Sequence, residues 1–335
     1  MRKVVTIGGG TGSFTLLSGL KEYPIELAAI VSMADDGGST GVLRDELGVL
    51  PPGDVRQCLV ALSDSSEKLR ELMNYRFEEG GLSGHSFGNL FLSALEKIEG
   101  GFVGGVSEAA KILNVKGAVI PVTATDTSLK ICLKDGKTLS GEHEVNTSLK
   151  VGKIGIERVF LDPKARANKE AVEKILGADL IIIGPGNHYC SIIPNLLVDG
   201  IPQAIRKSKA KVVYNCNLVN KRGHTDGYTL DDYVEEINGF LGGERVDFVT
   251  FNTKMPAKSV LERYSKENGE LVVFDPERSS ERRYRVIKAD LLSKKNVQYS
   301  AKDKIASTRS YIRHDTERLA KVLMMLLELG EYENI

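Results

Sequence analysis

Two glycine-rich loops near the amino terminus hold the residue types best suited to binding an anion. The first has the sequence Gly-Gly-Gly-Thr-Gly at residues 8–12, directly after a short apolar segment, and the second covers residues 35–44. Glycines without a Cβ let backbone N–H groups close on a phosphate, and a helix that begins there adds the positive end of its dipole. The residues expected to bind phosphate are Gly9, Gly10, Thr11 and Gly12.

The second loop begins with two adjacent carboxylates, Asp35 and Asp36. Such a pair can hold Mg²⁺ that bridges phosphates, accept hydrogen bonds from ribose hydroxyls, or remove a proton from an acceptor. The NAD fingerprint is incomplete, because Ser13 stands where the third small residue is usually glycine or alanine. The other ligand candidates in this loop are Gly38, Ser39 and Arg44.

Two further charged residues, Arg56 and Asp54, are also candidates for ligand contact. Arg56, like Arg44, has the forked geometry that suits phosphate. Asp54 fits either an N-terminal cap of a helix over residues 55–63 or a ligand contact.

A third loop, residues 84–89, contains His85 between two glycines and ends at Asn89, where a helix is expected to begin. His85 is a candidate for phosphate binding or acid/base chemistry, and its alternative role is to hold the loop by hydrogen bonds. Further along, strand ends are followed by more ligand candidates, with a purely structural turn as the alternative. These later candidates are Gly184, Gly186, Asn187 and Asn217.

Composition narrows the class of protein. The 335 residues include 45 Lys+Arg and 45 Asp+Glu, so no basic excess predicts a nucleic-acid partner. The four cysteines form no C-x-x-C pair, which favours reduced thiols over a disulfide framework or zinc site. No signal peptide or run of about 20 apolar residues is evident, so we expect a cytoplasmic protein without membrane insertion.

Apolar segments alternate with helical patterns along the chain and predict an α/β fold, a Rossmann-like, doubly wound, mainly parallel sheet. We expect a single large domain over residues 1–335. Expected strands cover residues 3–7, 25–33, 118–121, 180–183, 211–214 and 246–251, and expected helices cover residues 12–22, 168–176, 230–241 and 316–329.

Two segments depart from this alternation. Residues 126–162 show a strand, turn, strand pattern and are expected to form a small antiparallel hairpin extension. Residues 276–310 are polar and poorly patterned, which indicates a peripheral strand pair or a flexible segment. Because ligands bind at the carboxyl ends of parallel strands, we expect the loops after residues 7, 33, 183 and 214 to converge on one site.

Ordered blocks over nearly the whole chain resemble the gluconeogenesis factor group of the 2-phospho-L-lactate transferase-like superfamily. The resemblance rests on residues 8–12, 35–44, 51–62, 84–90, 184–186, 191–198, 217–218 and 312–316. It implies a nucleotide-sugar ligand, especially UDP-N-acetylglucosamine, and a role in cell shape and gluconeogenic growth. It also implies that Tyr264 and Arg313 contact this ligand, where a ring can stack on uracil and an arginine can pair with diphosphate.

Two functions are compatible with these residues. The first is a nucleotide-sugar binding protein that regulates carbon metabolism and cell wall synthesis, because no Ser/His/Asp triad or P-loop lysine is evident. The second is an Mg²⁺-dependent transferase that moves phospholactate from a guanosine diphosphate carrier to a deazaflavin acceptor. Asp35, Asp36 and His85 are its catalytic candidates. The sequence leaves open whether the protein forms a homo-oligomer or has regulatory protein partners. Gln57, residues 187–188 and His224 differ from the pattern of the family that the chain resembles, and these differences affect the choice of ligand.

Overall fold

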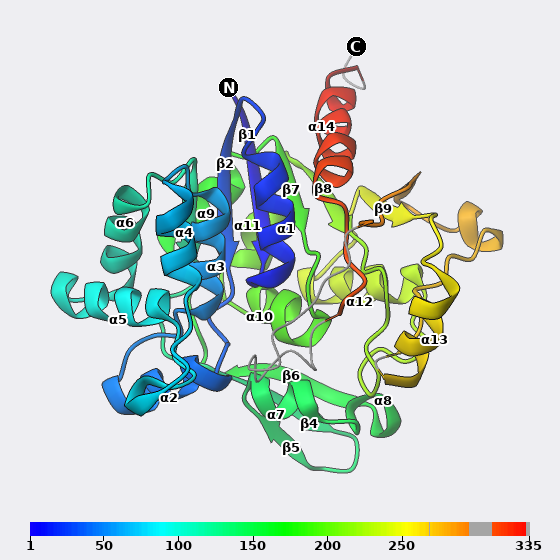
Figure 1. Ribbon diagram of the computed structural model, residues 1–335. Coiled ribbons are helices and arrows are strands. Elements are labelled where there is room, and N and C mark those ends of the chain that lie inside the picture. Colours follow the sequence, from blue (N-terminus) through cyan, green and yellow to red (C-terminus); the bar gives the residue numbers. More distant parts are fainter. Residues whose placement is uncertain (268, 295–309, 333–335) are drawn as a thin grey trace.

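A parallel β-sheet forms the centre of the protein, whose computed structural model describes residues 1–267, 269–294 and 310–332 (Figure 1). Within this part of the chain, the sheet has seven strands in the order β10-β9-β8-β7-β1-β2-β3, and every neighbouring pair is parallel. The strands are β1 (Arg2–Gly8), β2 (Ile25–Val31), β3 (Ala118–Pro121), β7 (Leu180–Ile183), β8 (Lys211–Asn215), β9 (Phe248–Asn252) and β10 (Arg285–Ala289).

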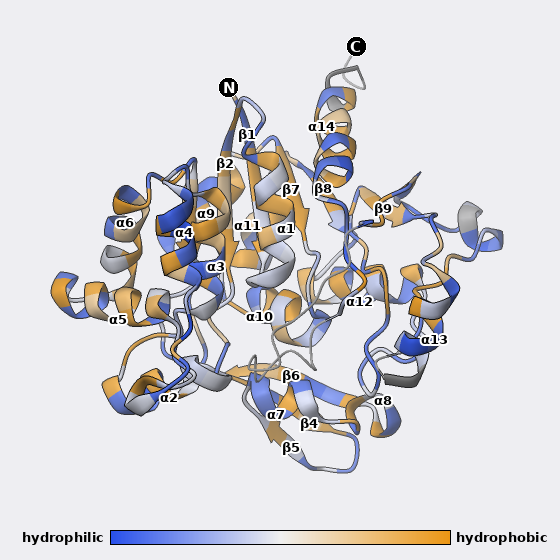
Figure 2. Ribbon diagram, viewed as in Figure 1, coloured by the Kyte–Doolittle hydropathy of each residue, from blue (hydrophilic) through white to orange (hydrophobic). Residues whose placement is uncertain are grey.

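The central strands are apolar on both faces because helices cover both faces. All four residues of β7 are buried, and Figure 2 shows the hydrophobic colour along these strands. On one face α1 (Thr11–Leu20) packs between α3 (Gly53–Leu62) and α14 (Thr316–Tyr332). On the other face α11 (Ile201–Lys207) packs between α9 (Lys169–Leu176) and α12 (Leu230–Leu241). The predicted doubly wound fold is therefore confirmed.

The remaining helices lie outside this central layer. They are α2 (Gly38–Leu47), α4 (Glu67–Asn74), α5 (Phe87–Glu99), α6 (Phe102–Ile112), α10 (Ile193–Leu196), α13 (Lys258–Glu267), the short helical turns η1 (Gly80–Leu82) and η3 (Glu277–Ser280), and the π-helical turn η2 (His188–Ile192). No helix among the described residues is long and apolar enough to cross a bilayer.

Gly19 lets α1 and α14 approach closely. A Cβ added at Gly19 would lie 2.5 Å from the Thr316 carbonyl oxygen and 2.9 Å from the Ala320 Cβ. The helix that ends the described chain is thereby held against the helix that follows the glycine loop.

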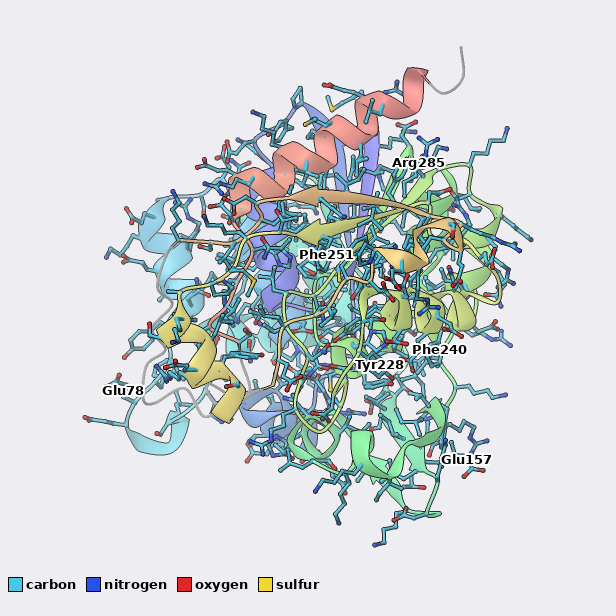
Figure 3. The ribbon with its side chains drawn as sticks, turned by 90° about the vertical axis from the view of Figure 1, so that its right-hand side faces the viewer. Glu78, Glu157, Tyr228, Phe240, Phe251 and Arg285 are labelled. Atoms are coloured by element: carbon cyan, nitrogen blue, oxygen red, sulfur yellow. The ribbon has the colours of Figure 1, made fainter. Side chains whose placement is uncertain are left out.

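The expected hairpin is present and is part of a larger lobe. The strands β4 (Ser128–Leu133) and β5 (Thr138–Ser140) pair antiparallel, and β6 (Ile156–Asp162) adds a third strand on the other side of β4. Between β5 and β6 lie two short helices, α7 (Glu142–Thr147) and α8 (Val151–Ile154). Figure 3 shows this lobe, marked by Glu157, below α12, marked by Phe240.

Within residues 276–294, which the structure describes, the polar segment contributes one strand of the main sheet. Its strand β10 pairs in parallel with β9 and forms an edge of the main sheet. No residue of β10 is fully buried, so this edge strand lacks the continuous apolar run that marked the central strands in the sequence. Residues 295–309 lie outside the described residues.

Candidate functional site

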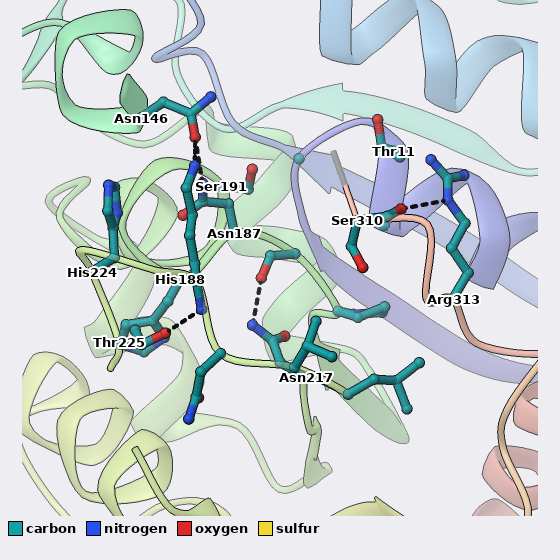
Figure 4. Close-up of a pocket in the computed structure, with 18 of the residues that line it drawn as sticks. Thr11, Asn146, Asn187, His188, Ser191, Asn217, His224, Thr225, Ser310 and Arg313 are labelled. Atoms are coloured by element: carbon teal, nitrogen blue, oxygen red, sulfur yellow. Dashed lines mark hydrogen bonds between the residues drawn. The ribbon is translucent and has the colours of Figure 1, made fainter. Parts of the chain in front are cut away.

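The order of the strands reverses between β1 and β7, and a cavity of about 500 Å³ lies at the carboxyl ends of these strands (Figure 4). This is the position at which open α/β sheets bind ligands. The predicted residues that line the cavity are Gly9, Gly10, Thr11, Gly12, Asp35, Gly186, Asn187, Asn217, Tyr264 and Arg313. The predicted residues outside its lining are Asp36, Gly38, Ser39, Arg44, His85, Asn89 and Gly184.

The glycine loop lies at one end of the cavity, where α1 begins. Gly10 precedes this helix and offers no capping side chain, so the first N–H groups of the helix remain at the loop. A Cβ at Gly9 would lie 2.7 Å from the Asp54 Oδ2, and one at Gly10 would lie 2.5 Å from the Gln57 Nε2. Side chains of α3 therefore lie directly over the loop, and a Cβ at either position requires these side chains to move.

Asp54 and Asp35 both line the cavity. Asp54 is the second residue of α3 and lies in its first turn, whereas Pro52 occupies the capping position. A carboxylate in a first turn is favoured by the helix dipole. Asp36 points elsewhere: its Oδ1 accepts a hydrogen bond of 2.7 Å from the His143 N–H of the lobe.

Arg44 also holds the lobe. Its guanidinium pairs with Asp126 at 2.5 Å and donates to the Thr127 carbonyl at 3.2 Å. Arg44 thus joins the second glycine-rich segment to the start of β4, and Asp36 joins it to α7.

Ser39, Arg56, His85 and Asn89 form a separate polar cluster, which we call the inner network. The Ser39 hydroxyl lies 3.0 Å from the His85 Nδ1, and the buried Arg56 donates from Nε to the Asn89 Oδ1 at 3.0 Å. Arg56 also donates to Asn74 at 2.6 Å. The inner network links α2, α3, α4 and α5, and none of its four members lines the cavity.

The loops after β7 and β8 form the middle of the cavity. Asn217 donates from Nδ2 to the Gly186 carbonyl at 3.0 Å and so ties the two loops together. The π-helical turn η2 follows, and π-turns are frequent at functional sites. Gly184 has a φ of +75°, which suits glycine, and it lies behind the lining as part of the turn.

Segments late in the chain form an apolar wall. Tyr264, Leu218 and Ile312 are buried together, and the ring of Tyr264 lies edge-on to that of Tyr311 at 5.4 Å. Arg313 follows directly, lines the cavity and donates from Nε to the Ser310 carbonyl at 3.4 Å. Both late candidates thus share one cavity with residues 9–12.

The sequence analysis missed the contribution of the lobe. Glu142, Asn146, Thr147 and Leu149 line the cavity, as does Lys221 from the loop after β8. The position of Lys221 after a buried strand was a usable signal, because that loop was expected at the site. Nothing in the sequence pattern of residues 142–149 indicates that they fold back onto the main sheet.

Burial perturbs several groups around the cavity. Burial, followed by the nearby Asp35 and Asp54, raises the pKa of Glu142 well above its ordinary value. Burial lowers the pKa of Lys221, although Cys190 and Glu142 oppose that shift. Burial also lowers the pKa of His224 to about 3 and the pKa of His314 to about 4, so both rings are neutral at pH 7.

His188, the first residue of η2, is held by Glu236 of α12. Its Nε2 lies 2.9 Å from the Glu236 Oε2, and Tyr189 donates to Glu236 at 2.9 Å. Burial, followed by the Glu236 charge, raises the pKa of Tyr189 above its ordinary value, which keeps its hydroxyl a donor. These hydrogen bonds tie η2 to α12.

The residues fit a metal ion only together with a ligand. Within the described residues, no group of three or more His, Cys, Asp or Glu side chains is arranged to hold a metal. Mg²⁺ ordinarily takes one or two carboxylates and completes its six oxygens with phosphate and water. Asp35 and Asp54 provide such carboxylates beside the loop that is suited to phosphate.

Fold and cavity define a doubly wound α/β protein with a glycine-rich loop at the strand switch point. The chain belongs to the family described as 2-phospho-L-lactate transferase CofD, whose model matches residues 4–292.

Relatives and a solved structure cover nearly the same length. The gluconeogenesis factor of Bacillus subtilis is 40% identical over 328 residues, which are 97% of this chain and 98% of that protein. The gluconeogenesis factor of Halalkalibacterium halodurans is 46% identical over 276 residues, covering 82% of this chain and 84% of that protein. A crystal structure of a UPF0052 family member from Bacillus halodurans has a TM-score of 0.87 and 39% identity, covering 97% and 100% of the two chains. The resemblance drawn from the sequence is confirmed.

Proposed function

We propose that this protein binds a nucleotide sugar of the UDP-N-acetylglucosamine type and regulates carbon metabolism, cell wall synthesis and cell shape during gluconeogenic growth. The observation that carries this proposal is the division of one cavity into an anion-binding end and an apolar wall. Two relatives named gluconeogenesis factor support the physiological part. The cytoplasm, where nucleotide sugars are made and used, is the proposed location.

The two parts of the cavity suit the two halves of a nucleotide diphosphate. The N–H groups at residues 9–12 and the Arg313 guanidinium provide donors for phosphate oxygens. Tyr264, Leu218 and Ile312 offer apolar surface for a base. The cavity continues to the lobe, where Asn146 lies on the opposite side from Thr11 and Arg313, and this end is the place that we propose for the sugar.

Calorimetric titration with UDP-N-acetylglucosamine, GDP and NAD tests this proposal. We expect the UDP-sugar to bind most tightly, since the NAD fingerprint is incomplete. Equal or tighter binding of NAD or GDP contradicts the UDP-sugar assignment. A repeat with EDTA and with added Mg²⁺ tests whether the ion bridges the diphosphate to Asp35 and Asp54.

A transferase is the second candidate, because three carboxylates line the cavity beside the loop suited to phosphate: Asp35, Asp54 and Glu142. The family description names a transferase. Mg²⁺, held by Asp35 and Asp54 with phosphate oxygens, would neutralise charge on the transferred group. Glu142, with its raised pKa, is placed to hold or release a proton at its carboxyl group.

The transferase candidate is tested by incubating the protein with a phospholactyl guanosine diphosphate, a deazaflavin alcohol and Mg²⁺. Product formation that Asp35→Asn lowers far more than it lowers nucleotide affinity favours the enzyme. Asp36→Asn is the matched control, because its carboxylate faces His143 of the lobe and not the cavity. No product with the unchanged protein favours the binding function.

A further inference from the structure

Lys221 is a cation at the cavity end that faces the lobe, and its neighbour Arg222 also lines the cavity. In Figure 4, Asn146, His224 and Thr225 lie on the opposite side of the cavity from Thr11 and Arg313. Lys221 belongs to the first group, since its backbone N–H donates to the Thr225 Oγ1 at 2.9 Å and its Nζ donates to the Asn146 Oδ1. The two ends of the cavity therefore carry separate positive groups.

Both the backbone and the tip of Lys221 are held in place. The Asn146 Oδ1 that accepts from Lys221 also accepts from the Asn187 Nδ2 at 2.9 Å. Asn187 in turn accepts from the Cys190 N–H at 3.4 Å. Three segments, α7, the loop after β7 and the loop after β8, thus meet at one ammonium group that lines the cavity.

The ammonium lacks a charged partner in the described part of the protein. Glu142 is near enough to act on Lys221 electrostatically, but no described carboxylate forms an ion pair with it. An ammonium has three N–H donors, and Asn146, a neutral group, takes one of them. A partly buried ammonium with spare donors is a site for an oxygen acceptor.

We propose that Lys221 binds a carbonyl or carboxylate oxygen on the group that the ligand carries beyond its diphosphate. This inference rests on the proposed nucleotide-sugar function and adds a selectivity rule to it. A sugar with an acetamido or carboxylate substituent fills the site, whereas a sugar with only hydroxyl groups leaves the ammonium with a weaker acceptor. Lys221 is then a specificity residue, and Asn146 and Asn187 position it.

The test compares UDP, UDP-glucose, UDP-N-acetylglucosamine and UDP-glucuronate by calorimetry on the full chain. We expect the unchanged protein to bind the acetamido and carboxylate sugars roughly tenfold more tightly than UDP-glucose. In Lys221→Met this ratio falls to near one. Lys150→Met is the matched control, because Lys150 is exposed, lies in the lobe and does not line the cavity.

A second variant guards against misfolding of Lys221→Met. Asn146→Asp keeps the shape of the side chain and places a carboxylate on the ammonium, so it removes the preference by internal pairing. A preference that survives in both folded variants overturns the inference, and so does an unchanged protein that binds all UDP ligands equally. An unchanged protein that binds no UDP ligand overturns the proposed function and this inference together.

Discussion

The glycine loop at residues 9–12 and the inner network are two polar regions on neighbouring helices. The glycine loop faces the cavity, whereas the inner network holds helices together. The loop leaves N–H groups at the start of α1 and lines the cavity. In the inner network, Arg56 and Asn89 turn their polar atoms toward each other at 3.0 Å. The comparison teaches that polar residues near a strand end bind ligand only where the sheet topology leaves their donors unused.

The largest expected effect is at the loop itself. Gly10→Val places a branched Cβ against Asp54 and Gln57, so we expect UDP-sugar affinity to fall by about 3 kcal/mol, roughly a hundredfold. Calorimetry beside a thermal melt measures both effects. Gly81→Val is the control, because a Cβ there meets no atom within 4 Å. A stable Gly10→Val protein with unchanged affinity contradicts the assignment.

The inner network should respond in the opposite way. Asn89→Ala removes the acceptor of the buried Arg56 Nε, so we expect a loss of about 1–3 kcal/mol in the free energy of unfolding. Affinity for the ligand should stay within about twofold, since neither residue lines the cavity. Urea unfolding and calorimetry separate the two quantities. A large loss of affinity without a loss of stability would erase the contrast between the regions.

Arg313→Ala tests the second phosphate donor at the cavity end that holds the glycine loop. Loss of a charge-assisted phosphate contact should weaken UDP-sugar binding by about 1–3 kcal/mol. Arg318→Ala is the matched control, because that arginine pairs with Asp290 and does not line the cavity. Equal affinities for the two variants would leave Arg313 without a role in binding.

Tyr264→Ala tests the apolar wall. We expect a loss of about 1–3 kcal/mol in binding through lost stacking. Tyr264→Phe keeps the ring and removes the hydroxyl, which donates to the Asn220 carbonyl at 3.5 Å, so its affinity should stay near that of the unchanged protein. Thermal melts identify any loss of folding, since Tyr264 also packs with Leu218 and Ile312. A Phe variant as weak as the Ala variant contradicts stacking.

The smallest effect concerns pH. Because burial lowers the folded pKa of His224 to about 3 and of His314 to about 4, the unfolded state binds more protons below pH 6.5. Stability is therefore full above pH 6.5 and falls as the pH drops, by about 1 kcal/mol per histidine down to about pH 5.5. The midpoints of urea unfolding at about pH 6.5 and about pH 5.5 measure this loss of stability. His224→Gln should reduce the slope, and an unchanged slope contradicts the burial effect.

The sequence predicted the part of the site that depends on local pattern. Apolar strands followed by glycines gave residues 9–12 and Gly186, and parallel topology required those loops to meet. The sequence pattern could not predict the inner network or the position of the lobe, because both depend on long-range contacts. Whether His85 faces Ser39 or a ligand, and where α7 packs, are decided by contacts between residues 46 or more positions apart.

The strand order β2-β1-β7 also has a consequence for the growing polypeptide. On one side β1 pairs with β2 within the first 31 residues, whereas its other edge pairs with β7, which begins at residue 180. During synthesis that apolar edge stays unpaired while the lobe and seven further helices, α1–α6 and α9, emerge from the ribosome. Such an edge is a site for pairing with other chains. Nascent chains of this protein, stalled before residue 180, should therefore depend on chaperones more than the released chain does.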